Sequence, residues 1–297
     1  MGECNLCGSE KFRMVKDRLR GCPSRFKVFR CLSCGHIQVL PRPTPQEDKE
    51  FYDENMQDKN RGKKLEYAKL KENTIYDTRR HVELVKELVS GKECSIVDIG
   101  AGYGFFVNSL AEAGYSNVLG IEIGRERREL GQKHTAVRMI DYDVLHSQEK
   151  IGTFDCIALF HVLEHMADPI GFFKAIRHLM HERTVLICEV PNADELLLET
   201  CLAYNDFYWI RSHLNYFTRN SLQMCFQYAG LHNVEFRFQQ RYGLMNLCNW
   251  LSTGRPQIEQ PIFVMDERYG PIEGNYRQML ESQGHSDALI AVHRGSE

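Results

Sequence analysis

Two cysteine pairs near the N-terminus have the residue type and the spacing of a metal site. Cys4 and Cys7 form one C-x-x-C pair, and Cys31 and Cys34 form a second. Zinc prefers four soft donors at the corners of a tetrahedron, and each C-x-x-C turn can present two thiolates to one ion. The pattern therefore predicts a structural Zn²⁺ knuckle, because four thiolates leave no coordination position open for a substrate. Redox-active or simply buried thiols are the competing interpretation.

The segment around these cysteines is small and basic. Cys22 and His36 are alternative zinc ligands with poorer spacing, and Arg25–Arg30 alternates polar and apolar residues as a hairpin strand does. Residues 1–45 carry nine of the 37 Lys and Arg but only three of the 40 Asp and Glu, so their charge is +6 and that of the remaining chain is −9. A module of this size has little core, so we expect the metal to supply much of its folding energy.

A glycine-rich turn forms a second candidate site. The predicted strand 96–99 runs into Asp98-Ile-Gly-Ala-Gly-Tyr-Gly104, and a helical pattern follows. Glycines let the backbone approach a ligand where helix N–H groups point outward. The next predicted strand ends at Glu122, where a carboxylate can accept both ribose hydroxyls. The glycine spacing differs from the dinucleotide fingerprint, and Asp98 would repel a pyrophosphate but suits the ammonium group of a methionine moiety.

The elements that must position these residues alternate along the chain. From Ser95 onward, short β-branched runs alternate with helical patterns, which predicts an α/β fold with a mostly parallel sheet and helices on both faces. Ligands bind such sheets at the carboxyl ends of the strands. The predicted strands are 96–99, 118–121, 137–140, 156–160, 184–188, 234–239 and 287–293.

Length and composition set the wider expectations. The chain has 297 residues, of which 43% are hydrophobic and 26% are charged, as in a soluble globular protein. We expect no membrane span and no secretory signal, and the single cysteines within apolar segments fit a cytoplasmic location. The predicted domains are a zinc-binding module (1–45), a helical linker or lid (46–92), a core (93–240), and an insertion with the last strand (241–297). The linker begins with a capping box at Thr44–Glu47, which starts a helix reaching Tyr52.

Taken together, these blocks resemble the class I S-adenosylmethionine (SAM)-dependent methyltransferases across residues 95–235. The resemblance rests on Asp98–Gly104, Glu122, Phe154–Pro169, Thr184–Asn192 and His213–Thr218. It implies a Rossmann-like, seven-stranded methyltransferase sheet preceded by a small zinc-knuckle module. A nicotinamide-binding domain is the alternative, disfavoured by the glycine spacing.

The resemblance also implies a SAM site. It places the glycine turn against the methionine end, Glu122 on the ribose, and Asp141 or Tyr142 beside the adenine. Asp141 competes with Asp143 for that role, and a simple loop acid is the alternative. Phe160 and His161 would line the sulfonium. The implied cofactor-binding residues are Asp98, Gly100, Gly102, Tyr103, Glu122, Asp141, Tyr142, Phe160 and His161.

With its zinc knuckle, the chain is similar to the zinc-containing sugar methyltransferases, which carry a Glu-His pair before Leu-x-Tyr-Phe. The matching residues here are Ser212 and His213, followed by Leu-Asn-Tyr-Phe. The resemblance makes His213 the expected general base, with His161 and His165 as further catalytic candidates. Because serine replaces the glutamate, we expect O-methylation of a sugar or nucleotide-linked sugar, a small-molecule acceptor.

Other functions stay open at this stage. C-methylation of a keto sugar is one alternative, and the basic module could instead bind RNA for a nucleic-acid methyltransferase. The acidic body makes nucleic acid a less favoured partner. A non-catalytic binding protein with this fold is a third alternative. The insertion of about 45 residues between the last two predicted strands is expected to form a substrate lid or a homodimer contact.

Overall fold

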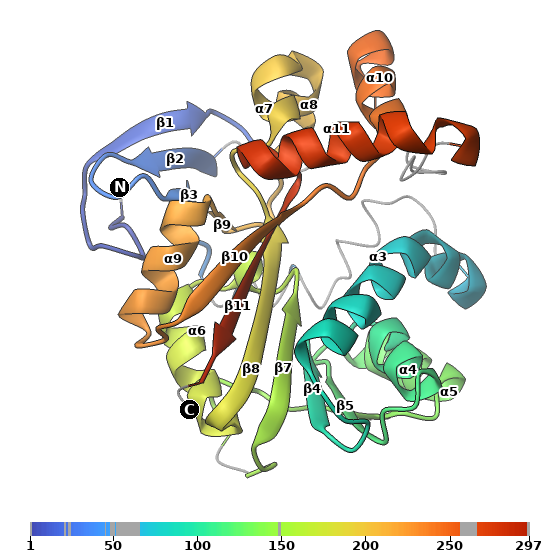
Figure 1. The fold of residues 1–297 in the computed structure, drawn as a ribbon. Helices are drawn as coiled ribbons and strands as arrows, with labels where there is room; N and C mark the ends of the chain where they lie inside the picture. The colour runs from blue at the N-terminus through green and yellow to red at the C-terminus, as the bar shows by residue number, and fades with distance from the viewer. Residues whose placement is uncertain are drawn as a thin grey trace.

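The computed structural model describes residues 2–20, 22, 25–44, 46, 47, 51, 66–147, 150–255 and 266–295. Its central element is a seven-stranded sheet in the order β10-β11-β8-β7-β4-β5-β6 (Figure 1). β11 is antiparallel to both of its neighbours, whereas the other adjacent strands are parallel. This arrangement confirms the predicted Rossmann-like sheet. The strands are β4 (Ser95–Ile99), β5 (Asn117–Ile121), β6 (Arg138–Ile140), β7 (Phe154–Phe160), β8 (Met180–Pro191), β10 (Val234–Gln239) and β11 (Ala288–Arg294).

Helices cover both faces of the sheet, as expected from strands that are apolar on both sides. On one face, Val85 of α3 and Phe106 of α4 pack with Ile96 of β4. On the other face, Phe173 of α6 and Phe226 of α9 pack against each other with ring centroids 4.4 Å apart. The helices of these layers and their loops are α3 (Tyr67–Leu88), α4 (Phe105–Glu112), α5 (Arg125–His134), η1 (Leu163–His165), α6 (Pro169–Ile176), η2 (Arg177–Leu179) and α9 (Arg219–Tyr228).

The N-terminal module is a second sheet, in the order β1-β2-β3-β9. β1 (Phe12–Lys16), β2 (Lys27–Cys31) and β3 (Ile37–Leu40) are antiparallel neighbours, and β2 corresponds to the predicted hairpin strand. The fourth strand, β9 (Asn215–Tyr216), comes from a distant part of the chain and pairs with β3. The module is therefore joined to the segment that follows His213.

The predicted linker is described only at its two ends. The capping box is present, since Glu47 N donates to Thr44 Oγ1 at 3.3 Å and Thr44 N donates to Glu47 Oε2 at 2.9 Å. Most of the helix predicted to follow it lies outside the described residues. Ile75 of α3 is apolar but 40% exposed, and the buried face of this helix begins with His81 and Val82.

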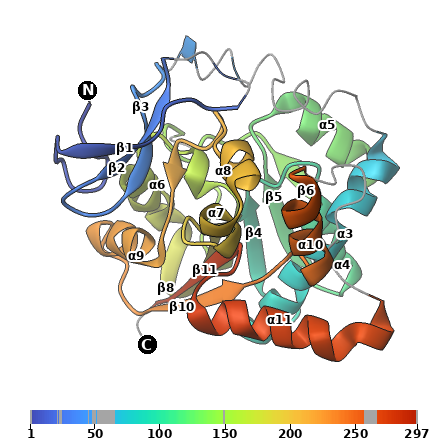
Figure 2. The same cartoon turned by 90° about the horizontal axis from the view of Figure 1, so that it is seen from above.

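Four helices lie above the carboxyl ends of β7 and β8 (Figure 1). They are α7 (Leu196–Thr200), α8 (Leu202–Tyr208), α10 (Leu244–Thr253) and α11 (Gly270–Gln283), the last preceded by η3 (Glu267–Tyr269). The view from above in Figure 2 places α7 and α8 between the N-terminal strands and α10. The insertion between β10 and β11 thus contributes two helices over the site. Among the described residues, no helix combines the length and the apolar character that a bilayer crossing requires.

Candidate functional site

The glycine turn closes around the carboxylate of Glu122. Glu122 Oε2 accepts a hydrogen bond from Gly102 N at 2.8 Å, and Oε1 accepts one from Gly124 N at 2.7 Å. Gly100 has φ +84°, and a Cβ there would come within 2.6 Å of Val162 Cγ2, so only glycine fits this position. Each carboxylate oxygen keeps a lone pair for another donor, such as a ribose hydroxyl.

Asp98 is a buried carboxylate without a donor. It is 5% exposed, and it accepts no hydrogen bond from the part of the chain that the structure describes. Burial, followed by the neighbouring charge of Glu122, raises the pKa of Asp98 to about 8. A buried carboxyl in this state is satisfied by a cationic donor, so these residues fit the ammonium group and the ribose of SAM.

The two candidates for the adenine side lie in different environments. The Asp141 side chain is 62% exposed, and it pairs with Arg128 Nη2 at 3.0 Å. Tyr142 is 3% exposed, packs in the sheet core, and has its hydroxyl 2.9 Å from His178 Nε2. Of the two, only Asp141 is accessible to a ligand. Tyr103 lies in the turn itself, with its ring 5.9 Å from that of Phe105.

Phe160 and His161 end β7 beside the N-terminal helix. The Phe160 ring stacks on His81 of α3, with centroids 3.6 Å apart. His161 lies between two carboxylates: Nδ1 is 3.3 Å from Glu164 Oε1, and Nε2 is 3.1 Å from Glu189 Oε1. Burial and the Arg241 guanidinium, whose Nη1 lies 3.1 Å from His161 Nε2, oppose protonation of His161, but Glu164 and Glu189 outweigh them and raise its pKa to about 9. His161 is therefore an imidazolium at neutral pH.

Glu189 is the centre of an ion-pair network at this edge. It is fully buried, and both of its oxygens accept hydrogen bonds from Arg80, at 2.6 and 2.7 Å. Asp77 pairs with Arg80 at 2.8 Å and with Arg241 at 3.6 Å. Burial alone would raise the pKa of Glu189, but the surrounding cations hold it well below the usual value. The network connects α3, β8 and the start of the insertion.

Glu164, His165 and His213 form a second cluster. Their ligand atoms all lie within 4.8 Å of one another, and the two imidazole rings are 5.1 Å apart. His165 Nδ1 donates to Ser212 O at 2.6 Å, which leaves the lone pair on Nε2. Glu164 Oε2 and His213 Nδ1 are buried and find no hydrogen-bond partner in the described part of the chain.

The charge states of this cluster place a neutral imidazole beside a carboxylate. Burial, reinforced by the nearby His165, lowers the pKa of His213 to about 3, so its imidazole is neutral at pH 7. Burial opposes ionisation of Glu164, but contact with His161 and the neighbouring His165 lower its pKa to about 2. A neutral imidazole beside a carboxylate can accept a proton, because the carboxylate stabilises the imidazolium that forms. The same three side chains could also hold a divalent cation.

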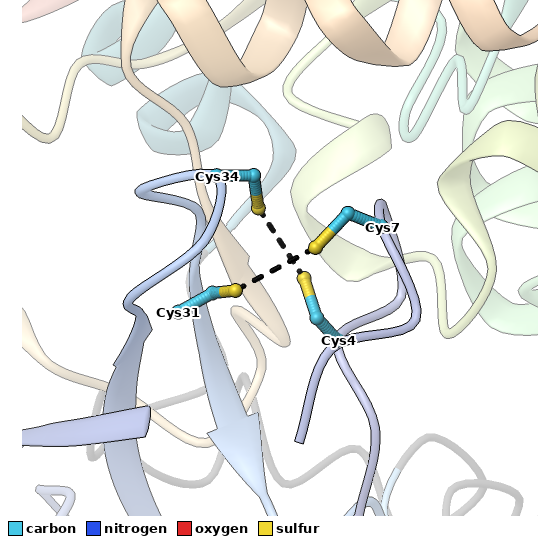
Figure 3. A group of neighbouring side chains, drawn as sticks. All are labelled: Cys4, Cys7, Cys31 and Cys34. Carbon is cyan, nitrogen blue, oxygen red and sulfur yellow. Dashed lines mark hydrogen bonds between the residues drawn. The ribbon is translucent and has the colours of Figure 1, made fainter. Parts of the chain in front are cut away.

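The four predicted zinc ligands converge at one point (Figure 3). Cys4 Sγ lies 3.5 Å from Cys34 Sγ, and Cys7 Sγ lies 3.6 Å from Cys31 Sγ. A tetrahedral ion with Zn–S bonds of about 2.3 Å requires sulfurs about 3.8 Å apart, so the donors are already near the required spacing. The alternative ligands do not join this group: Cys22 lies outside it, and His36 Nε2 is 3.1 Å from Asn215 Oδ1 instead.

The family described as "Methyltransferase domain" matches residues 52–236 of the chain. The chain belongs to this family. The methyltransferase match confirms the resemblance to class I SAM-dependent methyltransferases, whose strand order the sheet reproduces.

Curated relatives match part of this chain. The ubiquinone biosynthesis O-methyltransferase of Colwellia psychrerythraea is 33% identical over 112 residues, which is 34% of this chain and 45% of the relative. The protein of that name from Acinetobacter baumannii is 30% identical over 99 residues, 31% of this chain and 40% of the relative. The chain thus matches less than half the length of these relatives.

Solved structures share the fold. A SAM-dependent methyltransferase from Archaeoglobus fulgidus aligns with a TM-score of 0.51 and 16% identity, over 77% of this chain and all of that one. The plantazolicin methyltransferase BpumL, solved with SAH, aligns with a TM-score of 0.54 and 14% identity, over 84% of this chain and 93% of that one. At these identities the likeness concerns the fold alone.

Sequence reasoning missed part of the candidate site. Arg80, Glu189 and Arg241 are far apart in the chain, and only the folded sheet brings them together. Glu189 alone had a sequence signal, since it follows the predicted strand 184–188. Glu164 lies in a quoted block, but no pattern indicated that its carboxylate would lie beside His213.

Proposed function

We propose that this protein transfers a methyl group from SAM to a hydroxyl group of a sugar or nucleotide-linked sugar, with His213 as the general base. The observation that carries the proposal is the cluster of neutral His213, His165 and ionised Glu164 directly after β7. SAM, when bound, supplies an electrophilic methyl group. The chain's own residues then have two tasks, which are to hold both substrates in line and to remove the hydroxyl proton.

On the cofactor side, Asp98 would receive the ammonium group and Glu122 the ribose hydroxyls. Asp141 is the exposed candidate beside the adenine. Phe160 presents its ring at the end of β7, with His81 stacked against it. His161 is protonated at neutral pH and is therefore unsuited to act as a base. We assign His161 to positioning, since it holds the end of β7 against Glu189.

On the acceptor side, Ser212 stands where the similar sugar methyltransferases carry a glutamate. Glu164 would supply the carboxylate beside His213 instead. His213 Nδ1 is buried without a partner, and Glu164 lies next to it. The carboxylate would stabilise the imidazolium formed when the hydroxyl proton reaches His213. Proton transfer of this kind contributes about 10²- to 10⁴-fold to a rate. His165, held by Ser212 O, orders the same loop.

Two observations bear on O- against C-methylation. The curated relatives are named O-methyltransferases, which supports transfer to oxygen. Glu164 beside His213 gives the site a matched carboxylate and imidazole, which supports C-methylation of a keto sugar as the second candidate.

The wider assignments follow from the same residues. We propose that Cys4, Cys7, Cys31 and Cys34 hold a structural Zn²⁺, that residues 1–45 form its module, and that the protein works in the cytoplasm. Residues 46–92 would form a lid, residues 93–240 the SAM-binding core, and residues 241–297 a substrate cover or dimer contact. The placement of α10 and α11 over the carboxyl ends of the strands supports the cover.

One experiment tests the proposal. The purified protein is incubated with methyl-labelled SAM and, separately, nucleotide sugars, nucleotide-linked keto sugars, phenols and RNA, and products are identified by mass. We expect a methyl ether on a sugar hydroxyl. A product methylated on carbon would support the second candidate, and labelled RNA or a methylated phenol alone would reject the sugar acceptor.

A further inference from the structure

Asn215 is a buried amide between the cysteine site and the histidine cluster. It is fully buried in β9, two residues after His213, and pairs with Gln38 of β3. A buried carboxamide is costly unless its oxygen and nitrogen are both hydrogen-bonded, so its partners define what it holds together.

The oxygen of Asn215 accepts a hydrogen bond from each cysteine turn. Asn5 lies between Cys4 and Cys7, and its Nδ2 donates to Asn215 Oδ1 at 2.6 Å. His36 follows the second cysteine pair, and its Nε2 lies 3.1 Å from the same oxygen. Because Asn215 Oδ1 can only accept, His36 Nε2 must carry the hydrogen. Hydrogen bonds from both cysteine turns therefore converge on one atom, Asn215 Oδ1.

The side-chain nitrogen of Asn215 bonds to the segment that carries Glu164 and His165. Nδ2 donates to Met166 O at 2.7 Å, next to His165. The neighbouring backbone continues this connection, since Leu214 N donates to Glu164 O at 2.8 Å and Val39 N donates to Leu214 O at 3.0 Å. The segment that carries His213 is thus bonded to the segment that carries Glu164 and His165.

We infer that Asn215 is a positioning residue through which the tetrathiolate site fixes His213 and His165 relative to each other. A Zn²⁺ bound by the four cysteines would hold the turns that carry Asn5 and His36, and would thereby keep both donors at Asn215 Oδ1. On the cofactor side, no hydrogen bond or ion pair links described residues 2–44 to segment 98–124, although Leu6 and Ile99 belong to one apolar core. The inference rests on the proposed role of His213.

The test uses the full-length, zinc-loaded protein and two variants that break the connection at different points. Asn215→Asp keeps an acceptor for Asn5 and His36 but cannot donate to Met166 O. Asn5→Ala removes the donor of the first knuckle and leaves Asn215 in place, so it also serves if the buried substitution prevents folding. Ser33→Ala is the matched control, because its hydroxyl bonds to Ser9 within the module and does not reach Asn215.

The main readout is the imidazole NMR signals of His165 and His213, which are assigned with variants that each lack one of these histidines. SAM binding by calorimetry and zinc content are measured in parallel. We expect both variants to bind zinc and SAM as the wild type does, with both imidazole signals shifted, and the control to be unchanged. Removing zinc from the wild type with a chelator should shift the same two signals and leave SAM binding intact.

Two outcomes overturn the inference. Unchanged imidazole signals in Asn5→Ala and after chelation would show that the knuckles do not position the histidines. Variants that lose SAM binding as well as showing shifted imidazole signals would indicate a general structural role for Asn215 instead. Shifted signals combined with full turnover of a His213 variant would retain the positioning role and reject only the proposed base.

Discussion

His161 and Glu189 join the ends of two adjacent parallel strands, with imidazole Nε2 3.1 Å from carboxylate Oε1. The pairing of Phe160 with Glu189 in β7 and β8 sets this contact, and His161 N also donates to Glu189 O at 2.9 Å. His161 has φ +58°, a left-handed conformation that is uncommon for residues other than glycine. The two bonds to Glu189 therefore hold a strained residue at the edge where both substrates would meet.

We predict that this contact stabilises the folded protein less and less as the pH rises into the alkaline range. The pKa of His161 is about 9 in the folded protein and about 6.5 in an unfolded chain, so the imidazolium stabilises the folded state. The contribution, on the order of 3 kcal/mol, is fully present below about pH 6.5 and is lost as the pH rises through about 9. Urea denaturation at pH 6 to 10 should show the decline, and the decline should be smaller in His161→Gln, where the part that remains below about pH 8 comes from Asp98. His146→Gln, at an exposed site, should retain it.

Much of the fold could be predicted because its signals are local. The glycine turn, the strand before Glu122 and the two cysteine pairs each lie within a short segment, where residue type fixes backbone or metal geometry. The predicted strand 234–239 agrees with β10. Strand β8 is longer than its β-branched run at 184–188, because tertiary pairing with β7 and β11 extends it at both ends.

The rest depends on contacts between distant residues. β9 has only two residues, too few for any periodicity, yet it completes the N-terminal sheet. The sequence predicts Asp141 or Tyr142 beside the adenine; a tyrosine after a strand can turn to either side, and here Tyr142 packs into the core with its hydroxyl 2.9 Å from His178 Nε2. Glu164 lies beside His213 because β7 ends next to the loop that carries His213. No sequence spacing indicates this proximity.

We predict that Asp98 controls SAM affinity and its pH dependence. With a pKa of about 8 in the free protein, Asp98 is mostly protonated at pH 7, and binding an ammonium group favours the ionised form. SAM affinity should therefore rise from pH 6 to about pH 8, with proton release on binding, and level off above it as the ligand's own ammonium group loses its proton. Asp98→Asn should weaken binding about 10- to 100-fold, the loss of one charge-assisted hydrogen bond, and remove this pH dependence. Calorimetry in buffers of different ionisation enthalpy measures both; equal affinity of the variant would contradict the assignment.

We predict that the zinc site tolerates loss of Cys22 but not of Cys4. Cys4 is buried in the cluster, whereas Cys22 lies outside it. Burial raises the pKa of the Cys4 thiol to about 11, so its thiolate depends on a bound cation. Cys4→Ser should lose zinc on dialysis against a chelator and lose the thermal transition of the module, while Cys22→Ser keeps both. Elemental analysis and calorimetry decide; zinc retained by Cys4→Ser would place the metal elsewhere.

We predict that substitutions at the neighbouring residues Ser212 and His213 have different effects, because Ser212 acts through its backbone carbonyl and His213 through its side chain. The hydrogen bond from His165 goes to the backbone carbonyl of Ser212, which the substitution keeps, so Ser212→Ala should leave turnover nearly unchanged. His213→Gln should reduce kcat about 10²- to 10⁴-fold, the usual contribution of a general base, with SAM affinity intact. Glu164→Gln should reduce kcat less, because it removes the charge that stabilises the imidazolium but keeps the base. Steady-state kinetics with the acceptor found in the panel and calorimetry with SAM test this order; a Ser212 variant as impaired as His213→Gln would assign the effect to loop structure.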